Sequence, residues 1–221
     1  LVDYTRKALN RAGLEITHEE HGLARGDLRY FGGFSITGKD IQADDRNLVV
    51  GIRNSHDKAF ASAICIGNQM LVCDNLCFSS DIKLARRHTP RILTDLPRVL
   101  SSAVSRVTSH WSDMANRIAS YQETEITRNQ AADLMIDLVD SKGFSARDVY
   151  KTVKEFEAPR HEEFKGNNLW NLYNACTEML KGSDVSKLPQ RTMTIQSNFD
   201  RLANHSPSLT VDNETGLVLP A

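Results

Sequence analysis

Cysteine, net charge and long apolar runs are all scarce in this chain, and each scarcity excludes a class of protein. The four cysteines among 221 residues predict free thiols rather than the disulfide framework of a small secreted domain. No apolar run is long enough to cross a bilayer, and charged residues interrupt the N-terminus where a signal peptide would need an apolar stretch. We therefore expect a cytoplasmic protein without a membrane partner.

Charge and aromatic residues give no whole-chain signal for nucleic acid. Lys and Arg number 27 against 28 Asp and Glu, so the formal net charge is -1. Aromatic residues make up 7% of the chain, and those near one another are few: Tyr30, Phe31 and Phe34. Single-strand binders typically interleave aromatic and basic side chains. Any polyanion site must therefore depend on a local concentration of charge.

Short β-prone runs separated by turn formers dominate the N-terminal half. Runs of this kind predict antiparallel strands joined by hairpins, and Gly67-Asn68 is expected to form one of the turns. We predict an α+β fold, with an antiparallel sheet of about five strands in this half. The expected strands are 14–18, 28–36, 48–52, 60–66 and 70–73.

The hydrophobic period changes to that of helices after Pro90. One long amphipathic helix is expected, with Asp95 as its cap and Pro97 in its first turn. Capping boxes at Thr127 and Ser145 begin two more helices. Segments 168–181 and 189–204 predict further helices, and 210–221 a loose tail. The helical half is expected to pack on or beside the sheet, with boundaries at 1–92, 93–206 and 207–221, or as a single domain.

The polar turn Asn54 to Lys58, which follows the third expected strand, carries side chains suited to acid–base or nucleophilic chemistry. If the chain turns back at Gly67-Asn68, Cys73 to Asn75 would end beside it. The catalytic candidates are His56, Asp57 and Cys73; the alternative is that this turn only supports a hairpin. Cys73, Cys77 and His88, with or without His56, could also form a metal site. Their spacing disfavours metal binding, so neither a metal nor another cofactor is expected.

Basic residues concentrate between Lys83 and Arg106, where six bases face only Asp95 within the segment and Asp81 just before it. Arginine forks suit phosphate groups, although a salt-bridged surface would show the same pattern. We predict phosphate or nucleic-acid binding near the polar turn and this segment. The residues assigned to it are Arg53, Asn54, Asp74, Asn75, Arg86, Arg87 and His88.

Four ordered motifs carry a family resemblance: GIRNSHDKAF, VCDNLCF, RRHT and FKGNNLWNLYNACTEML. Together they resemble the bacterial phage/plasmid-like protein family of unknown function, domain of unknown function 932. They cover the chain from about Arg53 to Leu180. The resemblance implies a mobile-element origin and a bacterial host cell, and it implies no particular chemistry.

Three functions follow as hypotheses. The first is phosphate, nucleotide or nucleic-acid binding in mobile-element DNA metabolism or counter-defence. The second is a hydrolase-like enzyme that uses His56, Asp57 and Cys73. The third is a self-associating structural protein, although burial of its apolar stripe inside one chain is the favoured interpretation. That stripe comprises Leu100, Val104, Val107, Trp111 and Met114, continuing to Ile118 and Tyr121.

Overall fold

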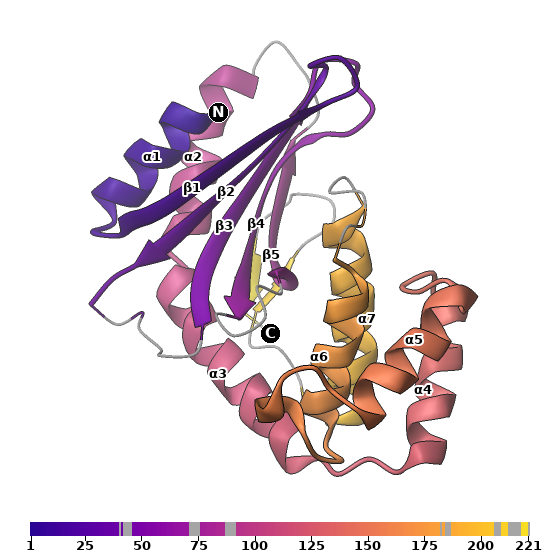
Figure 1. Ribbon diagram of the computed structural model, residues 1–221. Coiled ribbons are helices and arrows are strands. Elements are labelled where there is room, and N and C mark those ends of the chain that lie inside the picture. Colours follow the sequence, from indigo (N-terminus) through magenta and orange to yellow (C-terminus); the bar gives the residue numbers. More distant parts are fainter. Residues whose placement is uncertain are drawn as a thin grey trace. The chain divides into compact units, whose positions relative to one another are not determined.

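The computed structural model describes residues 1–39, 41, 46–70, 76–86, 92–181, 183, 187–205, 209–211 and 218–220. One helix and the strands of the larger sheet occupy residues 2–86, and helices occupy most of residues 92–202 (Figure 1). The α+β class and the antiparallel sheet are thus confirmed. In chain order the elements are α1 (Val2–Arg11), β1 (Glu15–Ala24), β2 (Arg29–Thr37), β3 (Arg46–Ser55), β4 (Ser62–Met70), β5 (Leu76–Arg86), α2 (Ile92–Val104), α3 (Val107–Glu123), α4 (Arg128–Asp140), α5 (Ala146–Glu157), η1 (Glu162–Phe164), α6 (Leu169–Met179), α7 (Leu188–Leu202), β6 (Leu209–Val211) and β7 (Val218–Pro220).

The chain separates into two compact units, each described here by itself. The sheet unit comprises Leu1–Gln69, Asp81–Ser112 and Pro207–Ala221, and the helical unit comprises Met70–Ser80 and Asp113–Ser206. The units are discontinuous in sequence, and the expected boundary at residue 92 stays a prediction. None of the described helices is long and apolar enough to cross a membrane.

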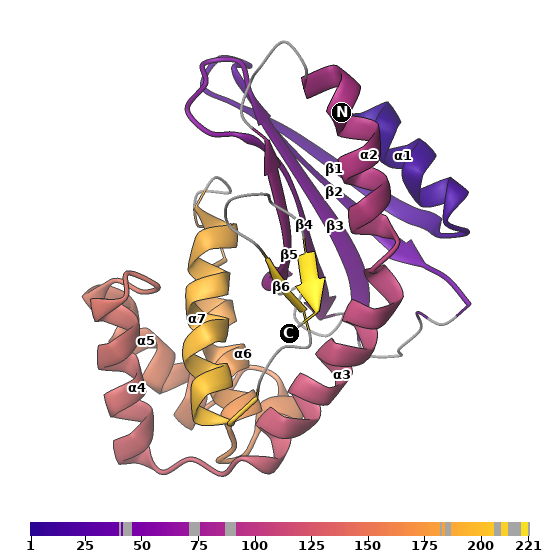
Figure 2. The same ribbon diagram turned by 180° about the vertical axis from the view of Figure 1, so that it is seen from behind.

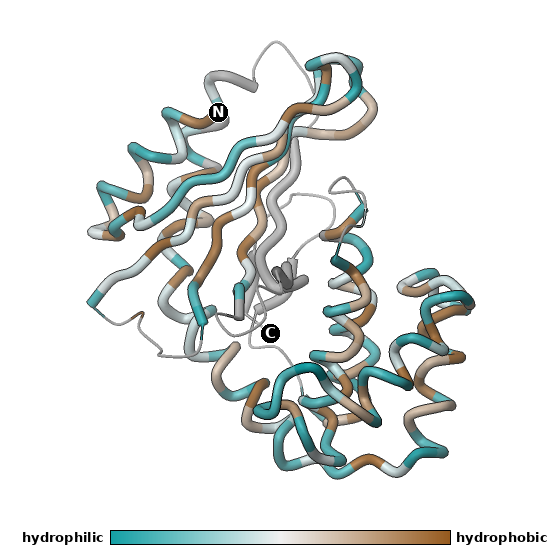
Figure 3. Tube along the Cα trace, viewed as in Figure 1, coloured by the Kyte–Doolittle hydropathy of each residue, from teal (hydrophilic) through white to brown (hydrophobic). Residues whose placement is uncertain are grey.

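The sheet is a meander in which the strands follow one another in the order β1-β2-β3-β4-β5. Strand β2 pairs antiparallel with both of its neighbours, with Phe34 opposite Val50 and Phe31 opposite Arg53. The edge strand β1 is largely hydrophilic, whereas β3 is apolar along its middle (Figure 3). This difference follows from position, because a central strand is covered more completely than an edge strand.

One face of the sheet forms the core of the sheet unit. Side chains on alternate residues share a face, so the register places one apolar set together, and its members are at most 3% exposed. Helix α1 lies on this face, since Arg6 bonds Glu19 of β1 and Leu9 is fully buried. Helices α1 and α2 pack against each other (Figure 2). The apolar set is Phe34, Ile36, Leu48, Val50 and Ile52.

The strand predictions hold for the first four strands and fail after them. The turn expected at Gly67-Asn68 is wrong, because β4 continues through both residues to Met70. Gly67 and Asn68 are buried within the strand, which shows that sheet pairing overrides a turn-forming dipeptide. The fifth expected strand, 70–73, lies mostly outside the described residues. Strand β5 instead spans Leu76–Arg86, a segment for which the sequence predicted no strand.

The long helix expected after Pro90 is in fact two helices. It begins earlier than predicted, so Pro97 lies inside α2 and Asp95 in its first turn. The break falls at Ser105 and Arg106, between α2 and α3. Serine hydroxyls bond backbone carbonyls on both sides of it, Ser105 to Ser102 and Ser109 to Arg106. Such bonds compete with the helical ladder.

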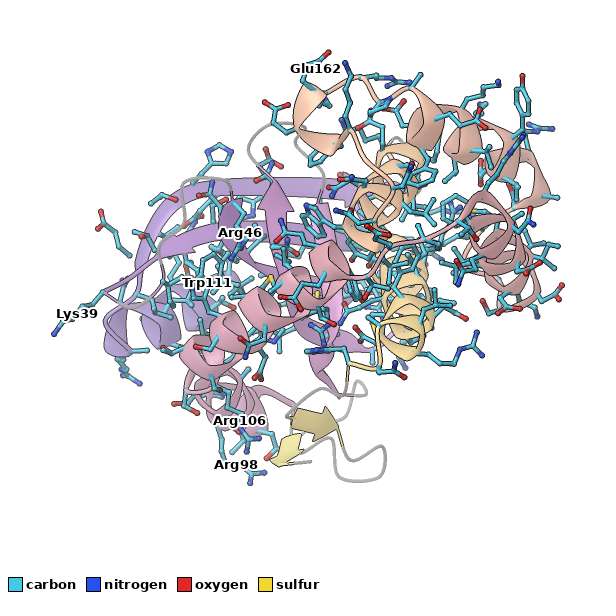
Figure 4. All side chains as sticks on the ribbon, turned by 90° about the horizontal axis from the view of Figure 1, so that it is seen from below. Lys39, Arg46, Arg98, Arg106, Trp111 and Glu162 are labelled. Atoms are coloured by element: carbon cyan, nitrogen blue, oxygen red, sulfur yellow. The ribbon has the colours of Figure 1, made fainter. Side chains whose placement is uncertain are left out.

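The apolar stripe of α2 and α3 is covered within one chain, as the favoured interpretation predicted. Each of its members is at most 7% exposed. Arg46 of β3 covers Trp111, with its Cζ 5.0 Å from the ring centroid (Figure 4). The third hypothesis, self-association through this stripe, stays a prediction. Its members are Leu100, Val104, Val107, Trp111, Met114, Ile118 and Tyr121.

The helical unit confirms most of the helix ends predicted from sequence. Thr127 and Ser145 both form the expected capping boxes, and Asn168 caps α6 by accepting from the backbone N–H of Asn171. Behind these caps, aromatic rings of α3, α6 and α7 pack together: Tyr121, Trp170, Tyr173 and Phe199. The tail differs from the expectation, because β6 and β7 pair as an antiparallel ribbon.

A buried polar cluster lies beside this aromatic core. The Nε of Arg117 donates to Oδ1 of Asp200 over 2.9 Å, and the Tyr121 hydroxyl donates to the same oxygen over 2.6 Å. The Arg117 and Asp200 side chains are only 5% and 10% exposed. Burial, followed by the neighbouring Asp200 charge, raises the pKa of Tyr121 well above its ordinary value. Tyr121 therefore remains a neutral hydrogen-bond donor.

Candidate nucleic-acid interface

The second face of the sheet carries a group of arginine and phenylalanine side chains. Phe31 and Arg53 are cross-strand partners, and Arg29 is two residues before Phe31 on β2, so all three side chains share this face. Phe60, in the turn between β3 and β4, completes the group. We call Arg29, Phe31, Arg53 and Phe60 the Arg/Phe cluster. It lies opposite the apolar face on which α1 packs.

Two guanidinium groups approach one aromatic ring in the Arg/Phe cluster. The Cζ of Arg53 is 4.9 Å from the Phe60 ring centroid, and that of Arg29 is 5.8 Å away. The Phe31 ring is 5.5 Å from Phe60, at an angle of 44°. All four side chains are partly exposed. These separations are those of cation–π contacts, so the cluster is held by stacking as well as by its strands.

The turn after β3 fixes the position of Phe60. The Ser55 hydroxyl donates to the Phe60 carbonyl over 3.0 Å and accepts from the Phe60 N–H over 3.2 Å. Asp57 accepts from the Ala59 N–H over 3.1 Å, a side-chain bond typical of an Asx-turn. Because both ends of the turn are bonded to side chains, the ring is held in place above the strands.

The two arginines of the cluster differ in their electrostatic partners. Arg29 donates to Asp57 over 2.9 Å. Burial opposes ionisation of Asp57, but bonds from the Ala59 N–H and from Arg29 outweigh it and lower its pKa. Arg53 has no carboxylate partner among the described residues, and its buried Nε has no hydrogen-bond acceptor there. Burial lowers the pKa of Arg53, yet an arginine keeps its charge near neutral pH.

The structure separates two neighbours that the sequence placed in one site. Arg53 points to the cluster, whereas Asn54 pairs with Tyr30 in the register and so points to the opposite face. There Asn54 accepts a hydrogen bond from the Ser62 hydroxyl. Asn54 is thereby engaged in joining β3 to β4. Of these two, only Arg53 lies on the face of the Arg/Phe cluster.

Several predicted site residues fall outside what the structure describes. Residues Cys73, Asp74, Asn75, Arg87 and His88 lie outside the described residues. Arg86 is the last residue of β5, so its backbone belongs to the same sheet as Arg53. The prediction that Cys73 to Asn75 lie beside Asn54 assumed a turn at Gly67-Asn68. Since β4 runs past that point, the reason for this placement is removed.

The catalytic hypothesis stays a prediction. His56 is exposed, and its backbone N–H donates to the Leu28 carbonyl over 2.7 Å. Asp57 is engaged by Arg29 and by its own turn. Cys73, the third candidate, lies outside the described residues. Within the described ranges, no group of three or more His, Cys, Asp or Glu side chains could hold a metal ion.

A chain of polar contacts that the sequence analysis missed lies on the helix-covered face. Arg6 of α1 donates to Glu19 over 2.6 Å, Glu19 meets His21 Nε2 at 3.0 Å, and His21 Nδ1 meets the Tyr30 hydroxyl at 2.7 Å. A Cβ at Gly32 would collide with the Tyr30 hydroxyl, so any larger residue there would displace the end of the Tyr30 side chain. Tyr30 is two residues from Gly32, the cross-strand partner of His21, so the alternation Glu19-x-His21 could have revealed this network once the β1–β2 register was known.

Replacing Glu19 with glutamine should reduce the loss of stability in acid. The hydrogen bond from Arg6 is the main cause that lowers the pKa of Glu19 from 4.5 to about 2, and burial opposes it. The stabilisation is therefore complete above about pH 4.5 and is lost as the pH falls toward 2. Because the side chain is 23% exposed, solvent screening leaves an effect of about 1 kcal/mol. Urea denaturation across this range measures it.

The neighbouring Glu20 provides the control for this measurement. Its side chain is 78% exposed and contacts only His18 among the ion pairs of the described residues. Glu20→Gln should follow the wild-type stability profile. If Glu19→Gln also follows it, the contact between Arg6 and Glu19 contributes nothing to folding.

Comparisons with known proteins give one match. A family model described as "Domain of unknown function (DUF932)" matches residues 1–204. No curated protein and no solved structure matches the chain. The match covers every strand of the meander and all the helices whose bounds are given above.

Proposed function

Because the chain belongs to this family of unknown function, DUF932, whose description assigns no activity, we propose a function from geometry: the protein binds nucleic acid through the Arg/Phe cluster. One observation carries the proposal. A guanidinium without a carboxylate partner in the described part of the chain is stacked on a partly exposed phenyl ring, on the sheet face opposite α1.

The aromatic members of the cluster supply a surface for bases. Phe31 and Phe60 are partly exposed and lie 5.5 Å apart between ring centroids. Unpaired bases stack on such rings, and each stacked base contributes about 1–3 kcal/mol without demanding a particular sequence. An unpaired strand presents its bases to a flat sheet more readily than a duplex does. The proposal therefore commits to single-stranded DNA or RNA.

Arg53 is the member best suited to contact phosphate. The charge of Arg29 is balanced by Asp57, whereas Arg53 has no such partner among the described residues. The Arg53 side chain is partly exposed although its Nε is buried, so a phosphate would meet the terminal nitrogens of the guanidinium. The basic residues of segment 83–106 include Arg98 and Arg106, which project from α2 and from the turn after it (Figure 4). Their contribution, and that of Arg86, Arg87 and His88, remains part of the proposal.

The biological setting is proposed on the resemblance alone. The four motifs resemble a phage/plasmid-like family, and this resemblance implies a mobile-element origin. We place the protein in mobile-element DNA metabolism or counter-defence on that basis. The test below addresses binding, which the geometry supports, and does not depend on this setting.

Substitution of Phe60 or Arg53 should weaken binding of a fluorescent oligonucleotide measured by anisotropy. Phe60→Ala should raise Kd by roughly 5- to 150-fold, since one stacked base is lost. Arg53→Ala should raise Kd and also reduce the slope of log K against log salt by about 1, because one phosphate contact is lost. Arg53→Lys should keep the slope while losing part of the affinity, since lysine keeps the charge and loses the planar fork.

Matched probes and a matched variant make the result interpretable. Single-stranded DNA, single-stranded RNA and duplex DNA of equal length should be compared, with the duplex expected to bind most weakly. Arg11→Ala removes the same charge from an exposed position on α1 and should leave Kd unchanged. The proposal fails if no probe binds at low salt, or if Arg11→Ala and Arg53→Ala weaken binding equally.

A further inference from the structure

Two helices of the helical unit carry matched patterns of opposite charge. Helix α4 reads Asp133-x2-Ile136-x3-Asp140, and α5 reads Arg147-x2-Tyr150-x3-Lys154. In each helix the charges lie three residues before and four residues after a large apolar side chain. Residues at these spacings are neighbours on one helix surface. Each helix therefore presents one apolar side chain flanked by two like charges, acidic on α4 and basic on α5.

Both apolar side chains point outward. Ile136 is 59% exposed and Tyr150 is 70% exposed. Ile136 lies opposite the buried face of α4, which comprises Ala131, Leu134, Met135 and Leu138. The charges beside it are exposed as well: Asp133, Asp140, Arg147 and Lys154. A single exposed apolar side chain is ordinary on a protein surface, and the matching charges around these two are what indicate an interaction surface.

The two helices bring these side chains to the same level. A groove of about 1000 Å³ is lined by Arg128 and Ala132 near the start of α4 and by Val153 and Phe156 near the end of α5. The start of one helix thus meets the end of the other, so they run antiparallel. Ile136 lies one turn beyond Ala132, and Tyr150 lies one turn before Val153. Because the helices run antiparallel, these two steps go in the same direction, and Ile136 and Tyr150 lie at similar heights along the helix pair.

Within one chain the charges next to Tyr150 have limited partners. Lys154 lies with its Nζ 5.9 Å from the Tyr150 ring and 3.5 Å from Glu157, an exposed contact. Glu157 also meets Arg128 at 3.6 Å. Exposed pairs of this kind contribute little to stability. They leave Lys154 available to exchange Glu157 for another carboxylate.

We propose that this surface binds a second copy of the chain. In a two-fold dimer, α4 of each copy lies antiparallel on α5 of the other. Ile136 then meets Tyr150 of the second copy, and Asp133 and Asp140 meet its Lys154 and Arg147. In an antiparallel helix pair, charges on the same side of the contact between Ile136 and Tyr150 face each other, so both charge pairs form. A two-fold axis repeats the contact, which gives the self-complementary surface that a closed dimer requires.

The charge pattern itself identifies the occupant as a second copy. A different partner protein would need a basic helix to face α4 and, beside it, an acidic helix to face α5. The chain already has that arrangement, because the spacing of the acids on α4 equals that of the bases on α5. This inference is independent of the Arg/Phe cluster, which lies in the sheet unit.

A charge-exchange experiment on the full chain tests the dimer by sedimentation velocity. The all-basic variant carries Asp133→Lys and Asp140→Lys, and the all-acidic variant carries Arg147→Glu and Lys154→Glu. Each alone should be monomeric where the wild type dimerises, since like charges then face each other. An equimolar mixture should form a heterodimer, because every facing pair is again opposite in sign. Combining all four substitutions in one chain should restore the homodimer.

Two further variants keep the test decisive. Ile136→Ser with Tyr150→Ser alters only exposed side chains and should weaken the dimer by about tenfold or more. Glu162→Lys with Glu163→Lys makes the same charge change at exposed positions of η1 and should leave the dimer intact; circular dichroism checks that each variant folds. The inference is overturned if the wild type stays monomeric up to about 100 μM, if both charge variants dimerise like the wild type, or if their mixture stays monomeric.

Discussion

Asp200→Ala should lower the free energy of unfolding by about 3–5 kcal/mol, since it removes the carboxylate that pairs with the buried Arg117 charge. Arg117 is 5% exposed and donates to Asp200 over 2.9 Å. The same substitution also removes the acceptor of the Tyr121 hydroxyl, and an unsatisfied buried donor destabilises further. Urea denaturation followed by circular dichroism measures the change. A loss this large is a substantial fraction of the stability of an ordinary domain.

Two comparisons separate the effect of burial from that of losing a carboxylate. Asp137 pairs with Arg201 over 2.7 Å, but both side chains are more than half exposed. Asp137→Ala should therefore change stability by only about 0–1 kcal/mol. The double variant Arg117→Met with Asp200→Leu should recover much of the loss, because apolar residues of similar volume can replace a buried pair. Equal effects of Asp137→Ala and Asp200→Ala would show that the buried pair has no special role.

Phe34→Ala should destabilise the chain by about 3–5 kcal/mol, whereas Phe60→Ala should destabilise it far less. Phe34 is fully buried on the sheet face that α1 covers. Its loss removes apolar contacts and leaves a cavity, and strands on both sides resist collapse into it. Phe60 is partly exposed on the other face, in the Arg/Phe cluster. Thermal and urea unfolding of the two variants measure the contrast.

The difference in stability between these two variants also shows whether a loss of oligonucleotide affinity comes from unfolding. If Phe60→Ala folds normally and still loses affinity for oligonucleotides, the affinity loss belongs to the surface and not to unfolding. Phe31→Ala offers a second check, because Phe31 packs beside Phe60 at 5.5 Å. A Phe60→Ala variant that unfolds as readily as Phe34→Ala would show that the ring is part of the core, contrary to the proposal.

The local signals in the sequence predicted the elements whose ends are fixed by nearby side chains. The capping boxes at Thr127 and Ser145 need only residues three apart, and both are formed. The first four strands were found because short β-prone runs bounded by turn formers mark them in the sequence. The turn at Gly67-Asn68 failed because pairing with neighbouring strands stabilises an extended backbone there. No local pattern reports that contribution.

The Arg/Phe cluster shows where sequence reasoning stopped. Arg53 was predicted as a site residue, but its companions come from β2 and from the turn after β3. Register decides which of these side chains share a face, and a shift of one residue would reverse the face. The sequence therefore pointed to Arg53 and Asn54 together, whereas the register sends them to opposite faces. Phe31 had been noted only as one member of an aromatic cluster.

The meander also sets an order for folding. Strands that follow one another in the sheet can pair through short loops, so their closure entropy is small and their association fast. Helix α1 is different, because it packs against α2, which begins at Ile92 after the whole meander has been made. The hairpins can therefore associate before α2 is available to α1. The docking of these two helices closes a loop that contains the whole meander, and it is expected to follow the pairing of the hairpins.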